Sequence, residues 1–464
     1  TWLEIETAHF HLHTDLAELP ARDLAQSLEE VRAGLLTLSW AKAPGPPDRS
    51  EVVVFARPSE FSRVRGDSRA AGELAHRPGF GRLIVFSPGA EATLSTTAVH
   101  ELAHELSFWF IPVQPTWFAE GLATFLETLT VDRATGRARL GEISKSSAAW
   151  LQGHLWSSGK LFATSEALSI DPRESASFYS SSWLLMHYLL NQHNVAFGRF
   201  QQQLAKLRDW RVVWQVELPQ LTTAPLDASL VAYGRRSEFS IKEAELHLPA
   251  FEAKVRRLSA AEAHGVLART AYVVGNEALA EQELEKAQRL DPSDVNAAEV
   301  EFSRLTSDPA RVELARRISK AHPRSANAWL LLARSDTSPQ LRAAALERAR
   351  ALSPEHPHVH WLSGWQALAE RRPEAALAHA HRVLRRWAVT PNLLALEVHA
   401  LAANGGCDVA RRIVADAPVT MNARCESLQT HQPVPCDTEL KQALAAACPA
   451  PSAPRSASRE RAER

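Results

Sequence analysis

The 464-residue sequence has no apolar run that approaches the roughly 20 residues needed to cross a bilayer. It also has no excess of either charge: 52 basic and 53 acidic side chains leave a formal net charge of -1. Such a chain has no electrostatic reason to bind nucleic acid or an anionic membrane surface. The apolar content of 45% and the charged content of 23% are typical of a globular protein with several cores. We therefore predict no membrane span and no nucleic-acid partner.

Cysteine is missing from most of the chain. The four cysteines, Cys407, Cys425, Cys436 and Cys448, all lie in its last fifth. Their spacing fits no zinc-finger pattern, and an even number clustered in this way favours two disulfides formed in an oxidising compartment, with the pairing left open. The chain starts at Thr1 without a charged and apolar leader, which fits either a removed signal segment or a shortened sequence. We expect a periplasmic or secreted protein, with four reduced cysteines in the cytoplasm as the alternative.

The strongest chemical signal is a short HExxH stretch. His100 and His104 lie four residues apart in a segment with the apolar spacing of a helix, for which Ser95 or Thr96 is a plausible cap. Because a helix turns once per 3.6 residues, the two imidazoles project from the same face. That separation lets both reach one zinc ion at about 2.0–2.1 Å. Glu101 lies beside the first histidine, where its carboxylate can take a proton from a water on the metal.

A third ligand is expected from a second helix. Pro112 and Pro115 end the first helix, and the apolar run after them starts another that can fold back antiparallel. Glu120 is predicted on the first turn of this helix, where it can face the two histidines. Two histidines and one glutamate with an open fourth position are the ligand set of a catalytic zinc.

The two segments HELAH and PTWFAEGLATFLE together resemble the peptidase MA-like domain of the gluzincin zinc metallopeptidases. The resemblance extends over roughly residues 2–245. It implies that His100, His104 and Glu120 are zinc ligands and that Glu101 is the general base.

Members of that clan also place a tyrosine on a helix downstream of the glutamate ligand, where its hydroxyl stabilises the oxyanion. The apolar segment at 177–190 predicts such a helix. Tyr179 is the best match to the catalytic tyrosine, with Tyr188 and His187 as rivals. The alternative for any of them is a packed side chain without a catalytic role.

The residues before the metal helix predict a small α+β layer. We expect strands at 2–14, 51–56 and 82–87, helices at 16–38 and 59–64, and a loop over 65–79. Alternation places His9, His11 and His13 on one face of the first strand, where they either hold a metal or form an ordinary polar face. The third strand is either the edge that pairs with the backbone of an extended peptide, as in related peptidases, or an interior strand.

From about residue 251 to residue 415 the sequence is rich in alanine, leucine and arginine and is predicted to be helical. Pro292, Pro323 and Pro354 end similar motifs at a 31-residue step. Trp329 and Trp361 start the next helices with a pattern that partly resembles tetratricopeptide repeats, although the step is shorter than 34 residues. We predict three to five stacked helix pairs whose concave face docks a peptide or protein, or which brace the peptidase domain.

The predicted fold is thus α+β: a small mixed N-terminal sheet, a mainly helical zincin-like domain and an all-α solenoid. The predicted parts are the α+β layer at 1–92, the zinc-binding part at 93–249, the repeats at 250–420, and a cysteine-containing segment with a disordered tail at 421–464. We predict a zinc peptidase acting on a peptide or protein substrate. Endopeptidase action is slightly favoured, because no acidic motif of the aminopeptidase type is recognisable. The alternatives are an inert scaffold whose repeats bind a protein partner, and hydrolysis of a non-peptide amide.

Overall fold

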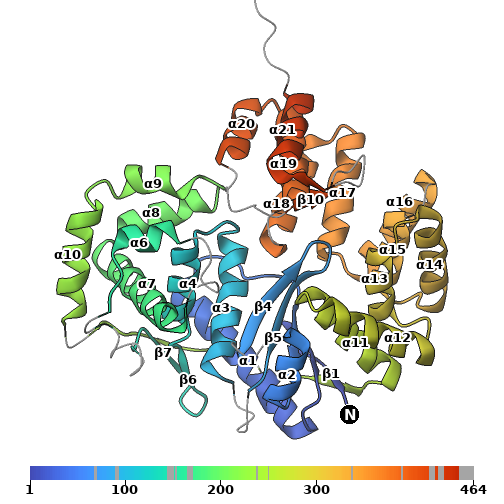
Figure 1. Ribbon diagram of the computed structural model, residues 1–464, viewed down its shortest axis with the longest axis horizontal. Helices are drawn as coiled ribbons and strands as arrows, with labels where there is room; N and C mark the ends of the chain where they lie inside the picture. The colour runs from blue at the N-terminus through green and yellow to red at the C-terminus, as the bar shows by residue number, and fades with distance from the viewer. Residues whose placement is uncertain are drawn as a thin grey trace, which may run out of the picture. The chain divides into compact units, whose positions relative to one another are not determined.

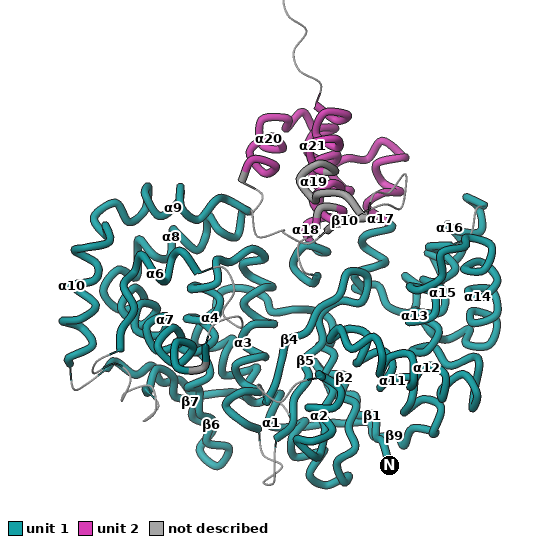
Figure 2. Tube along the Cα trace, viewed as in Figure 1, with its two compact units in different colours: residues 1–362, 382–388 teal, residues 363–381, 389–464 magenta. Residues whose placement is uncertain are grey.

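The protein is described by a computed structural model that covers residues 1–66, 71–88, 94–143, 151, 154–164, 171–236, 239–248, 250–335, 338–387, 390–416, 424–426 and 433–448. These residues form a six-stranded mixed sheet followed by many helices packed in consecutive pairs, which confirms the α+β prediction (Figure 1). Residues 1–362 with 382–388 form one compact unit, and residues 363–381 with 389–464 form a second (Figure 2). The four predicted domain ranges stay predictions.

The sheet has the strand order β4-β5-β3-β2-β1-β9. Its strands are β1 (Leu3–Glu6), β2 (Phe10–Thr14), β3 (Ser50–Val54), β4 (Gly72–Arg77), β5 (Gly81–Phe86) and β9 (Lys254–Arg257). The strands β2, β3 and β5 run parallel, while β1 pairs antiparallel with β2 and β9, and β4 pairs antiparallel with β5. Residues that are far apart in the sequence therefore complete one sheet.

The predictions for three segments are wrong. The segment 2–14 is two strands, because a turn closed by the hydrogen bond from the Thr7 amide to the Phe10 carbonyl divides it. The expected loop over 65–79 contains β4, and the region expected to be helical from residue 251 begins with β9. Both strands lie at sheet edges and have few apolar residues, so they lack the alternation by which a strand is recognised. Since β5 lies between β3 and β4, the edge strand is β4 and not residues 83–87.

Helices cover both faces of the sheet. Val52, Val54 and Phe86 point into a core formed with α1 (Glu18–Ser39), α3 (Thr96–Phe110) and α4 (Thr116–Leu126). Val53 and Val85 point the other way, into a core with α2 (Pro58–Arg65), α11 (Ala260–Val273) and α12 (Glu277–Leu290). Burial on both faces explains why the strand predicted at 51–56 is a continuous apolar run.

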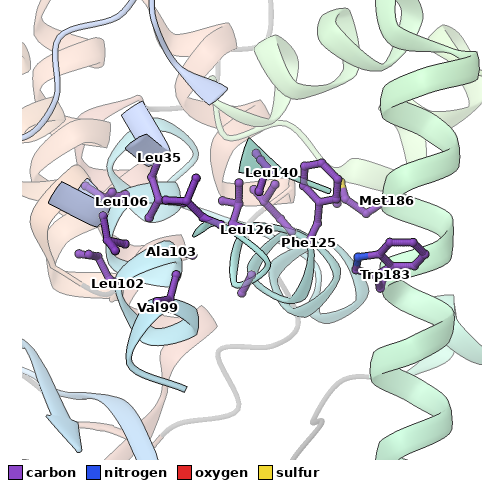
Figure 3. Packing of buried hydrophobic residues seen from close by; sticks show 14 of the residues in the cluster. Leu35, Val99, Leu102, Ala103, Leu106, Phe125, Leu126, Leu140, Trp183 and Met186 are labelled. Carbon is purple, nitrogen blue, oxygen red and sulfur yellow. The ribbon is translucent and has the colours of Figure 1, made fainter. Parts of the chain in front are cut away.

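The helices around α4 form a second layer of the larger unit. They are α6 (Ser158–Ala163), α7 (Pro172–Gln192), α8 (Asn194–Leu204), α9 (Trp210–Glu217) and α10 (Thr223–Gly234), with a small sheet of β6 (Thr130–Asp132), β7 (Arg137–Leu140) and β8 (Lys242–Glu245). Figure 3 shows Leu102 and Leu106 of α3, Phe125 of α4, and Trp183 and Met186 of α7 in one buried cluster. This shared core fixes α4 between α3 and α7.

The helices that follow include those of the predicted repeats. They are α13 (Val295–Arg304), α14 (Asp308–Ala321), α15 (Ala326–Ser335), α16 (Pro339–Leu352), α17 (Pro357–Ala369), α18 (Pro373–Arg386), α19 (Pro391–Ala403), α20 (Cys407–Asp416) and α21 (Cys436–Ala447), with the short strands β10 (Arg424–Glu426) and β11 (Pro433–Pro435). Consecutive helices pack against each other, such as α11 with α12 and α15 with α16, in agreement with the predicted helix pairs. Within the described ranges, no helix is long and apolar enough to span a membrane.

One of the predicted disulfides is present. Cys407 at the start of α20 is bonded to Cys448, which follows α21, so the disulfide joins the start of α20 to the end of α21 within the smaller unit. The side chains of Cys425 and Cys436 and the predicted disordered tail at 449–464 lie outside the described part of the chain.

Candidate metal centre

The helix α3 presents the histidines of the HExxH motif on the side opposite its core contacts. It begins after Ser95, whose hydroxyl accepts a hydrogen bond from the Ala98 amide at 3.2 Å, which confirms one of the two predicted caps. Leu102 and Leu106 are fully buried in the core. The ring centroids of His100 and His104 lie 4.7 Å apart, as expected for residues one helical turn apart.

Three potential ligand atoms converge between α3 and α4. Nε2 of His100 lies 3.0 Å from Nε2 of His104, and Oε2 of Glu120 lies 3.3 Å and 3.4 Å from these two nitrogens. Atoms bound tetrahedrally to one zinc ion at about 2.0–2.1 Å are separated by about 3.3–3.4 Å. The structure therefore brings together the three residues that the sequence singles out. One detail differs: the sequence predicts Glu120 on the first helical turn, but it lies at the start of the second turn of α4, which begins at Thr116.

A carboxylate that the sequence analysis missed lies behind the first histidine. Oε2 of Glu127 is 2.6 Å from Nδ1 of His100, so Nδ1 donates to this carboxylate and Nε2 is the nitrogen that faces the other two ligand atoms. Glu127 follows Glu120 by seven residues, which is two helical turns, and this spacing is the signal that could have revealed it. Two imidazole nitrogens and a carboxylate held this close need a cation or a proton between them. The donor set fits a zinc-type ion.

The charges of the site favour a cation. Burial alone would lower the pKa of His100, but its hydrogen bonds to Glu120 and Glu127 outweigh burial and raise that pKa to about 10. Burial would likewise raise the pKa of Glu120, but the imidazoles of His104 and His100 bring it well below the usual range. The arrangement thus keeps Glu120 ionised and stabilises a positive charge at the neighbouring Nε2 atoms.

Glu101 is held next to the triad by the edge strand of the sheet. Its Oε2 accepts a hydrogen bond from the backbone amide of Leu74 in β4 at 2.7 Å. The helix and the strand approach closely at Gly72, where an added Cβ would lie 2.9 Å from Cγ2 of Thr97. Burial raises the pKa of Glu101, with the neighbouring carboxylate of Glu120 adding to the effect.

Tyr179 on α7 lies beside the first histidine. Its ring centroid is 6.1 Å from that of His100, in an edge-to-face arrangement. Burial raises the pKa of Tyr179, and the carboxylates of Glu120 and Glu101 raise it further. Its hydroxyl therefore stays protonated at neutral pH and is able to donate a hydrogen bond.

The two rivals of Tyr179 have other contacts. The hydroxyl of Tyr188 lies 3.1 Å from Nε2 of His193. His187 is buried, with Nδ1 at 2.8 Å from the hydroxyl of Tyr233 and Nε2 at 3.2 Å from the carbonyl of Ser240. Of the three candidates, Tyr179 is the one for which the structure gives a ring contact with a residue of the triad.

The residue after His104 connects the metal helix to a distant segment of the same compact unit. Glu105 is buried and accepts a hydrogen bond from the guanidinium of Arg386. The same guanidinium donates to Oδ2 of Asp48 at 2.8 Å and to the carbonyl of Arg49 at 3.2 Å. The sequence carries no signal for this network, because its members are 281 or more residues apart from Arg386.

None of the curated proteins matches this chain. Residues 90–209 match the model of a family described as a protein of unknown function (DUF1570). The matched segment contains His100, Glu101, His104, Glu120 and Tyr179, so that this chain is similar to that family over the whole candidate metal centre.

Proposed function

We propose that this protein is a zinc-dependent peptidase whose metal is held by His100, His104 and Glu120. The observation that carries the proposal is the separation of 3.0–3.4 Å between the three donor atoms, with the carboxylate of Glu101 following His100 on α3. A purely structural metal site would not need a base such as Glu101. When bound, zinc would polarise the scissile carbonyl and lower the pKa of a water toward about 7.

In this proposal the side chains divide the proton transfers among them. Glu101 accepts the proton of the attacking water and passes it to the leaving amine, and its raised pKa suits transfer in both directions. The Leu74 amide keeps its carboxylate in place. Tyr179 donates its hydroxyl hydrogen to the oxyanion, and Glu127 holds the tautomer and orientation of His100.

The substrate that we propose is an extended peptide. The amide of Leu74 points to Glu101 and away from β5, which places the free side of β4 next to the proposed base. No strand of the described ranges pairs with that side of β4. A peptide added there would be held by its main chain, with a peptide bond brought near the metal centre. The helix pairs are proposed to dock the remainder of a substrate or a protein partner.

The disulfide between Cys407 and Cys448 supports a location outside the cytoplasm. Disulfides form and persist in the periplasm and in secreted proteins, whereas the cytosol keeps most thiols reduced. We therefore propose a periplasmic or secreted peptidase.

The decisive experiment replaces Glu101 by glutamine in the full chain. Glutamine keeps the shape of the side chain but cannot take up the proton. The variant is expected to bind zinc as the natural chain does and to lose turnover of a peptide library by about 10²- to 10⁴-fold. Zinc per chain is measured by elemental analysis, and cleavage is measured by mass spectrometry.

The control is Glu18→Gln, since Glu18 is exposed at the start of α1, and this variant should cleave normally. If folded, zinc-loaded natural protein cleaves no peptide that Glu101→Gln leaves intact, the peptidase proposal is refuted. The inert scaffold would then be the better description.

A further inference from the structure

A second group of metal-ligating side chains lies on the N-terminal sheet. Glu4 of β1 stands directly opposite His13 of β2, and His11 lies two residues along on the same face. His9 is not part of this group, because its ligand atoms do not lie within 4.8 Å of those of the other three residues; its Nδ1 lies 2.6 Å from Oε2 of Glu29. Of the two alternatives left open for these histidines, a metal site made of all three is not formed, and Glu4 takes the place of His9 beside His11 and His13. Within the described ranges, this group and the triad of α3 and α4 are the two whose ligand atoms lie within 4.8 Å of one another.

The distances in this group are longer than those of the triad and leave room for a shared cation. Oε2 of Glu4 lies 3.8 Å from Nε2 of His11 and 3.7 Å from Nε2 of His13. Both separations are too long for a hydrogen bond. They fit an ion placed between the atoms with bonds of about 2.1 Å and an angle of about 125°. The ring centroids of the two histidines lie 4.6 Å apart, which is close to the spacing of His100 and His104.

The surroundings repeat a feature of the first site. Glu51 of β3 is in register with His11, and its Oε1 lies 3.1 Å from Nδ1 of that histidine. As with Glu127 and His100, a carboxylate on Nδ1 leaves Nε2 free to bind a metal. On the other side, Arg256 of β9 donates to Oε2 of Glu4 at 2.6 Å and fixes that carboxylate. Its positive charge also opposes a bound cation, so this site should fill at a higher metal concentration than the triad.

We propose that Glu4, His11 and His13 bind a second divalent metal ion of the zinc type. Two imidazole nitrogens and one carboxylate oxygen are donors that zinc accepts, and three protein ligands leave one position for solvent. The side chain of His13 is 9% exposed, whereas His11 and Glu4 are 27% and 18% exposed, so an ion can enter from solvent. Because the ligands come from β1 and β2, a bound ion would hold the two strands together.

The test is to count zinc ions in the full chain and in variants of each site. Protein is saturated with zinc, freed of unbound metal, and analysed for zinc per chain. We expect two ions in the natural chain, one in the double variant H100A/H104A and one in the double variant H11A/H13A. The matched control is His9→Ala, which removes the histidine directly before β2 and should leave both ions bound.

The counts separate this proposal from the peptidase proposal. The proposal of a second metal site is overturned if H100A/H104A binds no zinc, or if H11A/H13A binds as much zinc as the natural chain. A second measurement does not depend on the folding of H11A/H13A: Co²⁺ bound to H100A/H104A should give a visible absorption band that Glu4→Gln removes. An unchanged band would equally overturn the proposal. If instead H11A/H13A binds no zinc while H100A/H104A binds one, the first site has failed and the second stands.

Discussion

Replacing Gly121 by alanine would push the helix that carries Glu120 away from its neighbour. A Cβ at residue 121 would lie 2.6 Å from the carbonyl oxygen of Ser182 in α7 and 3.0 Å from its carbonyl carbon. Carbon–oxygen contacts without strain begin at about 3.3 Å, so α4 and α7 would have to separate by about 0.7 Å. Both clashing atoms belong to the main chain, so a change of side-chain rotamer does not relieve the contact.

The displacement is large compared with what a metal site tolerates. Overpacking of this kind costs about 1–3 kcal/mol of stability. Metal–ligand distances are kept to within about 0.2 Å, and Glu120 is adjacent to the substituted residue. We therefore expect Gly121→Ala to lower both the free energy of unfolding and the zinc affinity, the latter by about tenfold or more. The sequence Glu120-Gly121 thus combines a ligand with the close approach that positions it.

Two assays and one control decide this prediction. Urea denaturation of the metal-free protein gives the change in stability, and competition with a chromophoric chelator gives the zinc affinity. The control is Gly198→Ala in α8, where a Cβ would meet no atom within 4 Å. At that position alanine should stabilise the protein by about 0.5–1 kcal/mol, because alanine loses less conformational entropy than glycine when the helix forms. If Gly121→Ala retains the stability and zinc affinity of the natural chain, the packing argument is wrong.

Three further predictions follow from buried charges. Arg386→Met should lower the free energy of unfolding by about 3–5 kcal/mol, since Glu105 would stay buried without its ion-pair partner. Urea denaturation measures this change, and the double variant R386M/E105Q should be more stable than R386M alone. Glu127→Gln should weaken zinc binding by about 10- to 100-fold, because His100 loses the carboxylate on its Nδ1; equal affinities in a chelator competition would contradict this role. Burial raises the pKa of Asp294 to about 7, so its ionisation costs stability increasingly as the pH rises from about 4 to 7. As the pH rises from 5 to 8, the stability of Asp294→Asn should therefore increase by on the order of 2 kcal/mol relative to that of the natural chain. If urea denaturation gives the same stability difference between the two proteins at every pH, the raised pKa of Asp294 is refuted.

The sequence alone determined the centre of the candidate site. The geometry of His100, Glu101 and His104 is a property of one helix, since residues four apart must share a face. Glu120 is only 16 residues further on, after a proline-containing turn, so few arrangements of the two helices were open to it. The α+β class and the helix pairs follow equally from local periodicity.

The tertiary structure decided what depends on distant partners. Only the sheet order shows that β4 and not β5 is the edge, and that Glu4 rather than His9 stands with His11 and His13. Only the packing of α7 shows which aromatic residue lies beside the metal centre, and only the folded chain brings Arg386 to Glu105. The physical reason is that hydrophobic periodicity records which face of an element is buried. It does not record which other element, hundreds of residues away, supplies the partner.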